Sequence, residues 1–499
     1  MKTNKNTNQK LILILLSLVM VLSLFAGCGQ KTDDGNEVTT NDPVTNSGDG
    51  TGTTEEVLIE PNFPEIELGT ISIIQRRNET REEWDPERES NTVIQQALIE
   101  RNNYLSNKYE DFDIEYYYVM TDSEFTPKLT TPISSGQQAY DIVIHPPMRL
   151  MWLANLGCLR LVQTVDNVNL DNPWWSTKLN ERLSYKGYNF FAVGNANLTA
   201  MWRTSAIYFN KSIAESVGLS VSELYQSVFN HTWTLEKMLT YAKQATMDGG
   251  DGLDVISNKD TFGIIQTPGF YPAFCGTGLT LADVNDDGEF FAKKASQEIV
   301  DRVTSMINYM NNDEIALPLT AGIDQWPHFA DGKGLFLVEG IAATQVVRDG
   351  EINYGLLPCP LGQDGQTEYH NFMHHGHGSA MAVPVDVDND YLAVIGAFLE
   401  EAGYSSRLKV WPAFYKTLMK GQIARDPESA DVMDIIFNNI STDIGLVYSD
   451  VYDAAIREMI ANNDYTSVKS KLDGLYDSMQ EALDEINVLY QEHIAKIGQ

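Results

Sequence analysis

The sequence predicts an α/β protein with two lobes and a helix-rich C-terminal part. Short apolar or β-branched runs alternate with segments of helical periodicity between residues 69 and 156. A second alternation of this kind begins after residue 205, and the chain is mostly helical in pattern from residue 387 onward. This alternation is typical of largely parallel sheets with helices on both faces.

The first lobe is predicted from three β-rich runs separated by helical segments. YDIVI at 140–144 is a continuous apolar run, as expected for a strand that is buried on both faces. Apolar residues recur near helical spacing in residues 90–109, between the first two runs, and in residues 148–156, after the third run. The predicted strands are 69–74, 113–119 and 140–144, and the predicted helices are 90–109 and 148–156.

The second lobe is predicted from a further set of strands at 206–210, 261–265, 334–340 and 354–360, with a helix at 234–245. No internal repeat is visible. We predict that residues 61–205 plus approximately 330–380 form the N-terminal lobe. Residues 206–329 plus approximately 381–499 are then predicted to form the C-terminal lobe.

The composition excludes several classes of protein. The 499 residues include 35 basic and 69 acidic side chains, giving a formal net charge of −34. Nucleic acid is therefore not the expected partner, because phosphate binding needs a basic surface. Four cysteines without a CxxC pair do not predict a disulfide scaffold or a cysteine zinc site. We expect Cys158, Cys275 and Cys359 to be buried and reduced.

The N-terminus has the pattern of a secretory signal. Three lysines precede an apolar run of fifteen residues, Leu11 to Phe25, which is shorter than the roughly 20 residues of a membrane-spanning helix. The following LFAGC resembles a bacterial lipobox, so residues 1–27 are predicted to be a lipoprotein signal peptide and Cys28 the lipidated residue. Ordinary cleavage with a free Cys28 is the alternative. Residues 28–60 are predicted to be a disordered tether.

Polar and aromatic side chains stand next to the ends of the predicted strands. Ligands bind outside the carboxyl ends of strands in open α/β sheets. An aromatic face with planar hydrogen-bonding groups is a combination that suits sugars. The residues are Gln75, Arg76, Asn78 and Glu79, then His145, then Trp202 and Arg203, then Tyr271 and Glu339.

Several longer segments resemble a known family. They are YDIVI, WWSTKLNERLSYKGYNFFAVG (174–194), IYFNKSIAESVGL (207–219), HTWTLEKMLTYAK (231–243) and RDPES (425–429). Their order and spacing resemble the extracellular solute-binding proteins, family 1, of bacterial carbohydrate ABC importers, over roughly residues 65–460. The resemblance implies a two-lobed periplasmic-binding-protein-like (type II) fold with hinge crossovers that closes on a sugar or oligosaccharide. It also implies delivery to a membrane permease and no catalytic activity.

The resemblance carries over a set of ligand-binding positions. The residues at the strand ends named above are carried over as ligand-binding positions. The resemblance also implies that Trp411 and Tyr415, within VWPAFYKTL in the C-terminal part of the chain, form an aromatic wall of the ligand site. Four histidines cluster in HNFMHHGHG: His370, His374, His375 and His377. A metal site is one interpretation. We favour a glycine-rich crossover in which His374 contacts the ligand, and we predict no metal ligands.

Two acidic loops could hold calcium. Asp248 and Asp251 lack the alternating spacing of an EF-type loop. The segment 283–290 has that spacing, but Lys294 stands where a bidentate glutamate is needed, and a hairpin turn explains the segment equally well. We therefore predict no cofactor and leave calcium open.

Two further groups of residues have alternative interpretations. Trp174 and Trp175 could be a sugar platform, but core packing is favoured. Arg76, Arg77 and Arg81 could bind an acidic sugar. We favour the pairing of at least two of them with acids of the same loop, which are Glu79, Glu82, Glu83 and Glu87.

Three functions follow from these observations. The first is a lipid-anchored capture protein on the outer face of the cytoplasmic membrane, monomeric, with a carbohydrate ligand and an ABC permease as partners. The second is a glycan-binding surface lipoprotein without a transport role. The third is a glycoside hydrolase, which needs two facing carboxylates. No nucleophile elbow, HExxH or phosphate loop was found in the sequence.

Overall fold

The structure is a computed structural model. It describes residues 58–76, 83–88, 91–250, 252, 257, 259–266, 271–318, 323–419 and 428–497. The predicted signal peptide, Cys28 and the tether up to residue 57 lie outside the described residues.

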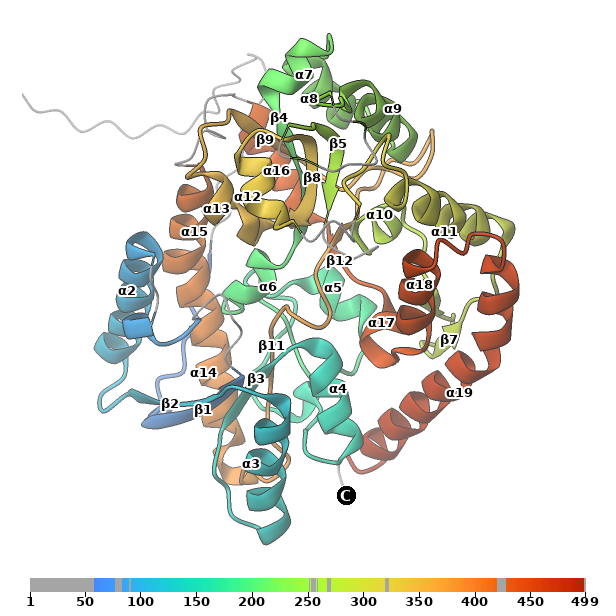
Figure 1. The fold of residues 1–499 in the computed structure, drawn as a ribbon. Coiled ribbons are helices and arrows are strands. Elements are labelled where there is room, and N and C mark those ends of the chain that lie inside the picture. The colour runs from blue at the N-terminus through green and yellow to red at the C-terminus, as the bar shows by residue number, and fades with distance from the viewer. Residues whose placement is uncertain are drawn as a thin grey trace, which may run out of the picture. The chain divides into compact units, whose positions relative to one another are not determined.

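The first sheet has the order β11-β3-β1-β2 (Figure 1). Its strands are β1 (Thr70–Arg76), β2 (Asp113–Val119), β3 (Ile142–His145) and β11 (Ala380–Ala382). β1 pairs in parallel with both β2 and β3, whereas β11 pairs antiparallel with β3. Its helices and turns are η1 (Pro86–Arg88), α2 (Thr92–Lys108), α3 (Asp122–Ser135), α4 (Pro147–Asn155), η2 (Val162–Thr164), α5 (Thr177–Arg182) and α6 (Leu198–Trp202).

The second sheet has the order β5-β8-β4-β9. Its strands are β4 (Ser205–Asn210), β5 (Phe262–Gln266), β8 (Gly334–Gly340) and β9 (Tyr354–Leu357). β4 is antiparallel to β8 and β9, and β5 is parallel to β8, so this sheet is mixed. The elements between β4 and β11 are α7 (Lys211–Ser216), α8 (Val221–Phe229), α9 (Leu235–Ala245), α10 (Tyr271–Cys275), β6 (Ala282–Val284), β7 (Phe290–Ala292), α11 (Gln297–Met310), α12 (Gln325–Ala330), η4 (Ile341–Ala343), α13 (Thr344–Val347) and β10 (Asn371–Phe372).

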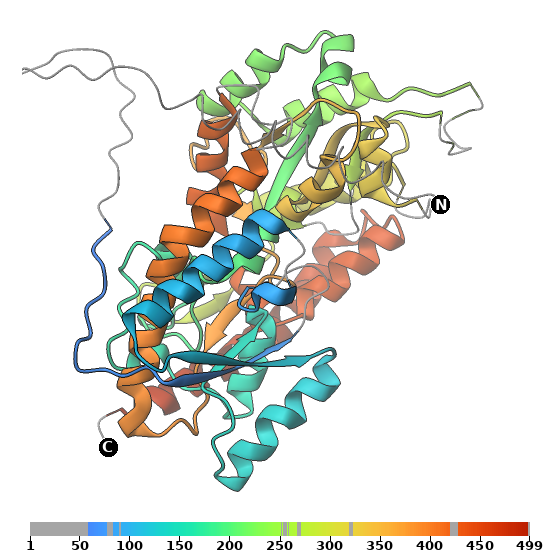
Figure 2. The same ribbon diagram turned by 90° about the vertical axis from the view of Figure 1, so that its left-hand side faces the viewer.

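The C-terminal part is helical, as predicted. It comprises η5 (Asn389–Tyr391), α14 (Leu392–Ser405), a π-helical turn (Ser406–Val410), α15 (Trp411–Met419), α16 (Glu428–Asn438), β12 (Ile440–Ser441), α17 (Ile444–Tyr448), α18 (Val451–Ala461) and α19 (Val468–Ile494). α14, the π-helical turn and α15 follow one another without a break, and α14 lies beside α2 (Figure 2).

The predicted lobe boundaries after residue 330 are wrong in two places. β8 and β9 fall within 330–380, which was assigned to the N-terminal lobe, but both hydrogen-bond to β4 of the second sheet. α14 falls within 381–499, which was assigned to the C-terminal lobe, and β11 lies at the edge of that range. β11 nevertheless pairs with β3 of the first sheet, and Phe398 of α14 packs on Trp84 of the first lobe with ring centroids 5.5 Å apart. The chain therefore returns to the first lobe only at β11, because backbone pairing and not sequence position decides lobe membership.

A buried carboxylate explains the tryptophan pair at 174–175. Glu400 of α14 accepts hydrogen bonds from the indole nitrogens of Trp174 (3.0 Å) and Trp175 (2.9 Å). The Asn172 side-chain amide and the Asn169 backbone N–H also donate to Glu400. Both tryptophans are buried, which confirms the prediction that they pack in the core.

The two remaining local predictions concern a hairpin and the cysteines. β6 and β7 form the hairpin, and the Asn285 Oδ1 accepts from the backbone N–H groups of Asp287 and Glu289. Gly288 adopts a φ of +77°, which glycine tolerates without steric cost. The segment is therefore a turn. Cys158, Cys275 and Cys359 are buried and free, as predicted.

None of the helices in the described part of the chain combines the length and the apolar character that a membrane-spanning helix requires.

Asp443 gives a testable pH dependence. It is fully buried, accepts from the backbone N–H groups of Leu281 and Gly445, and burial raises its pKa from 3.8 to about 6. Between pH 3.8 and about 6 the folded state keeps a proton that the unfolded state has lost. The protonated Asp443 therefore adds to the free energy of unfolding at low pH, and this contribution is lost as pH rises through about 6. At about 1.4 kcal/mol per pKa unit, it amounts to about 3 kcal/mol.

We expect Asp443→Asn to lose less unfolding free energy than the wild type between pH 4 and pH 7, as measured by urea unfolding. The exposed Asp390 provides the control, and Asp390→Asn should follow the wild-type pH profile. Equal pH profiles for Asp443→Asn and the wild type would contradict this assignment.

Candidate ligand-binding site

Three chain segments meet at one edge of the first sheet. β1 and β3 are parallel, so their carboxyl ends, Arg76 and His145, lie at the same edge. β11 runs the opposite way and begins with Ala380 opposite His145. Residues 374–379, which lead into β11, therefore arrive at this same edge, more than 200 positions further along the chain.

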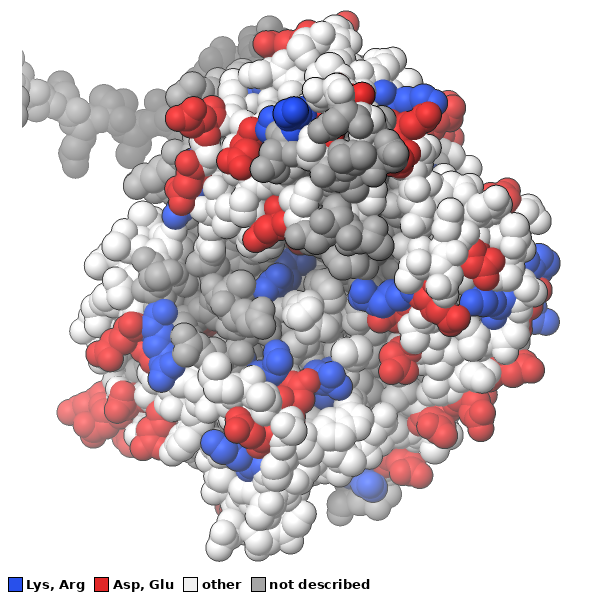
Figure 3. Space-filling view, in the orientation of Figure 1, with Lys and Arg blue, Asp and Glu red and all other residues white. Residues whose placement is uncertain are grey.

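A pocket of about 510 Å³ opens at this edge. The first lobe contributes the ends of β1 and β3, the start of α3 and one face of α4. The opposite side comes from the histidine loop (374–377), the end of α17, and α18. Figure 3 shows this face of the molecule hollowed at its centre, with charged side chains around the hollow. The polar lining of the pocket consists of Arg76, Asp122, His145, Arg149, Asn155, His374, His375, His377, Ser449, Asp450, Asp453 and Arg457.

Ion pairs hold the charged side chains of the pocket. The Asp122 carboxylate binds the Arg76 Nε at 2.7 Å and the Arg149 Nε at 3.0 Å. On the other side, the Arg457 Nε donates to the Asp453 Oδ1 at 2.8 Å. The ion pairs hold planar carboxylate and guanidinium groups in the pocket lining, as polar recognition of a small ligand requires.

His145 is a buried, neutral imidazole. Only 3% of it is exposed, and its ring lies 4.3 Å from that of Phe125. Burial, followed by the nearby Arg76 and Arg149, lowers its pKa to about 3. Its Nδ1 is buried without a hydrogen-bond partner among the described residues. A neutral imidazole in this position can donate one hydrogen bond to a hydroxyl group or accept one from it.

The histidine loop is also uncharged where pKa shifts are resolved. Burial lowers the pKa of His375 to about 4, with Arg457 and His377 acting in the same direction and Asp453 opposing them. Burial and the neighbouring His375 and His377 hold the pKa of His374 well below its usual range. In the described part of the chain, no group of three or more His, Cys, Asp or Glu side chains could hold a metal ion.

Of the predicted ligand residues, Arg76, His145 and His374 come together in this pocket. Gln75 and Trp202 do not line the pocket, and they are 4% and 0% exposed. The Trp202 ring packs at right angles on Phe414, with centroids 4.7 Å apart, in the apolar core. Asn78 and Glu79 lie outside the described residues, as does the side chain of Tyr271 at the start of α10.

Arg203 and Glu339 stand at the edge of the second sheet. The Arg203 carbonyl accepts from the His374 backbone N–H at 3.1 Å, so Arg203 adjoins the histidine loop. Glu339 accepts from the indole nitrogen of Trp326 at 3.1 Å. Neither residue lines the pocket.

The predicted aromatic wall at Trp411 and Tyr415 does not line the pocket. Trp411 packs on Phe414 and Phe437, with centroids 5.6 and 5.0 Å apart. The Tyr415 hydroxyl donates to the Ala430 carbonyl at 3.1 Å. Both residues pack against the core instead of the pocket, because α15 turns this face toward α16.

The pocket residues that the sequence analysis missed include Asp122, Arg149, Trp152, Asp453 and Arg457. Asp122 begins a helix just after a predicted strand, and Arg149 stands four residues after His145. Both would have been found if the search for polar residues after each predicted strand had extended four residues further. The remaining three carry no local signal. Arg76 pairs with Asp122. The predicted pairing of the arginines within their own loop stays a prediction, because Arg77, Arg81, Glu79 and Glu82 lie outside the described residues.

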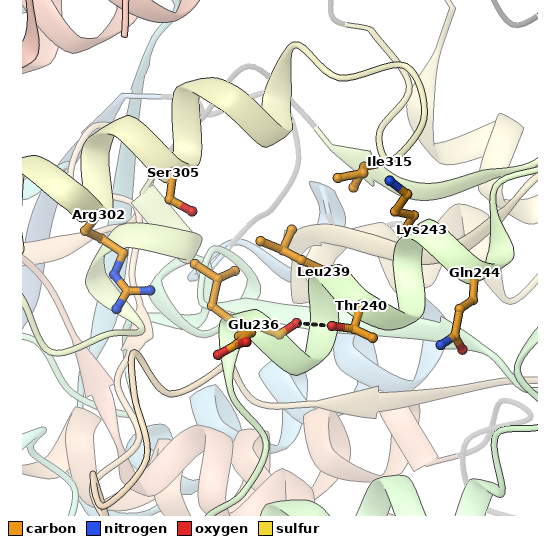
Figure 4. A pocket seen from close by; sticks show the side chains of 9 residues that line it. Glu236, Leu239, Thr240, Lys243, Gln244, Arg302, Ser305 and Ile315 are labelled. Carbon is orange, nitrogen blue, oxygen red and sulfur yellow. Dashed lines mark hydrogen bonds between the residues drawn. The ribbon is translucent and has the colours of Figure 1, made fainter. Parts of the chain in front are cut away.

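A second hollow of about 750 Å³ lies between α9 and α11 (Figure 4). It is lined by Leu239, Lys243, Arg302 and Ile315 among others, all from the second lobe. A ligand there would not touch the end of the first sheet, where the predicted residues Arg76 and His145 lie.

Comparison with known proteins identifies the fold. ABC substrate-binding protein Lmo0181 from Listeria monocytogenes, in complex with cycloalternan, matches with a TM-score of 0.55 and 16% identity, over 83% of this chain and 99% of that chain. The chain has the fold of ABC solute-binding proteins. UgpB from Mycobacterium tuberculosis, in complex with glycerophosphocholine, matches with a TM-score of 0.56 and 13% identity, over 84% of this chain and 99% of its own.

The GacH receptor of Streptomyces glaucescens matches with a TM-score of 0.50 and 17% identity, over 87% of this chain and all of its own. No family model and no curated protein matches the sequence. The solute-binding-protein fold therefore rests on the structural match, which confirms the two-lobed α/β architecture predicted above.

The protonation state of His145 can be tested by NMR. We expect its imidazole carbon signals to stay those of a neutral ring from pH 8 down to pH 5, because burial and two arginines lower its pKa to about 3. The variant His145→Gln assigns the signal by its loss. A midpoint near pH 6.5 would contradict the buried, neutral assignment.

Proposed function

We propose that this chain is a lipid-anchored solute-binding protein that captures a sugar or oligosaccharide and delivers it to the permease of an ABC importer. The fold supports a role in solute binding. The observation that carries the proposal is the pocket, which the end of the first sheet and α17–α18 build from opposite sides. A ligand that contacts both sides would favour a closed conformation.

The pocket lining suits a polyhydroxylated ligand. Guanidinium, carboxylate and imidazole groups offer planar donors and acceptors for hydroxyls. Trp152 of α4 lines the same pocket and is 44% exposed, although large aromatic side chains are usually buried. Its face can cover the apolar C–H surface of a sugar ring.

The carboxylates of the pocket favour binding over glycoside hydrolysis. A hydrolase needs one protonated and one ionised carboxyl on either side of the scissile bond. Here Asp122 is bound by two guanidinium groups and Asp453 by a third. Both carboxylates are thus engaged by arginine side chains instead of facing a glycosidic bond.

Lipidation at Cys28, a position on the outer face of the cytoplasmic membrane and a monomeric state complete the proposal. They are supported by the N-terminal sequence pattern and the resemblance to importer lipoproteins. A glycan-binding lipoprotein without a transport role is distinguished by gene deletion. Loss of uptake of the bound sugar, with the permease intact, supports import, whereas normal uptake contradicts it.

We expect Trp152→Ala to weaken binding of the best ligand from a glycan panel by roughly tenfold, because the aromatic contact with the sugar ring is lost. Isothermal calorimetry measures this change. Tyr465 is 47% exposed and lies outside the pocket, so Tyr465→Ala is the matched control and should bind as the wild type does. Equal affinities for the two variants would exclude Trp152 from the site.

A further inference from the structure

The pocket runs along α4 for most of the length of that helix. The α4 residues that line it include Met148, Trp152 and Asn155, which follow one another at intervals of three or four positions and so lie on one face. At about 1.5 Å per residue, Met148 and Asn155 are about 10 Å apart along the helix axis. One pyranose ring is shorter than this, so the wall has room for more than one sugar unit.

The opposite wall has a similar length. Asp450 stands at the start of α18, and Asp453 and Arg457 follow on the same face, one and two turns further along. From Asp450 to Arg457 this face also extends for about 10 Å. Asp450 is exposed and Ser449 before it is half-buried, so their side chains can hydrogen-bond the hydroxyl groups of a sugar. Both walls therefore offer ligand contacts over two helical turns.

Different contacts occupy different parts of the α4 wall. The first turn of α4 lies against the histidine loop, because the Met148 backbone N–H donates to the His375 carbonyl at 3.3 Å. The exposed Trp152 stands one turn further, about 6 Å from Met148 along the helix axis. Asn155, also exposed, follows three residues later. A ring that contacts the histidine loop and a ring that stacks on Trp152 therefore occupy successive positions.

The end of α4 extends the apolar part of this wall. Leu156 follows Trp152 by four residues, about one helical turn, and is 49% exposed. It lies outside the pocket lining, so a ligand reaches it only by extending beyond the pocket. The C–H faces of successive sugar rings can pack on exposed apolar side chains spaced in this way. The α4 wall thus favours an extended ligand over a compact one.

We propose that the ligand is an oligosaccharide that lies along α4, with one ring at the histidine loop and the next ring on Trp152. This inference rests on the proposed function and decides between a single sugar and an oligosaccharide. Asn155 is then a ligand-binding residue of the outer position, where its side-chain amide can donate to one ring hydroxyl and accept from another.

Calorimetry with the purified chain from residue 29 onward tests the proposal. The probes are glucose, galactose, mannose, xylose and N-acetylglucosamine, each compared with its linear disaccharides and trisaccharides. In a series that binds, we expect a longer sugar to bind about tenfold or more tightly than its monosaccharide, because the second ring adds the contact with Trp152.

The variants Trp152→Ala and Asn155→Ala should each reduce this ratio of affinities, Trp152→Ala to about twofold or less. Both side chains are exposed, so the melting temperatures should stay near the wild-type value. Tyr465 and Asn462 are exposed and lie outside the pocket lining, so Tyr465→Ala and Asn462→Ala are the matched controls and should keep the full ratio.

A monosaccharide that binds as tightly as its disaccharide and trisaccharide would overturn the oligosaccharide proposal and leave sugar capture intact. A wild-type ratio in both Trp152→Ala and Asn155→Ala would overturn the placement of the ligand along α4. The absence of binding by every sugar of the panel would overturn the proposed function as well.

Discussion

The buried carboxylate of Glu83 is the contact on which the arrangement of the crossovers depends. It accepts a hydrogen bond from the Thr199 backbone N–H at 2.5 Å and another from the Ser379 hydroxyl. Thr199 belongs to the first passage between the sheets and Ser379 to the return into β11, so one side chain ties both to the first lobe. Burial raises the pKa of Glu83, while the hydrogen bonds from Ser379 and Thr199 oppose this rise. A buried carboxylate lacking these donors would be strongly unfavourable, so the contact specifies where both crossovers lie.

Arg101 holds this region from the other side. Its guanidinium is 1% exposed, donates to the carbonyl groups of Glu83 and Trp84, and lies 4.2 Å above the Trp84 ring. Trp84 in turn packs on α14, which brings the C-terminal helices to the first lobe. Ser379 follows directly on the histidine loop, so its contact with Glu83 also helps to place that loop at the edge where β1 and β3 end.

Much of the fold could be predicted because its signals are local. β2 was predicted with its observed bounds, and β1, β4, β5, α4 and α9 within one or two residues, since apolar periodicity and strand-end polarity belong to each segment itself. α3 escaped prediction because Pro127 and Pro132 usually break helices, although Thr121 caps its start and Gly136 its end. That helix carries Asp122, so the omission removed the central carboxylate of the site from the prediction.

The sequence by itself determined the α/β class, the positions of β1, β2, β3, β4, β5, β8 and β9 along the chain, and three of the pocket residues, Arg76, His145 and His374. The strands follow from apolar patterning, Arg76 and His145 from adjacency to a strand end, and His374 from the histidine cluster. Only the tertiary structure decided that β8 and β9 join the second sheet, that Trp202 is core, and that Arg149 and Arg457 face one pocket. The physical reason is that strand pairing, burial and ion pairing join residues far apart in the chain. Their geometry depends on packing that no single segment encodes.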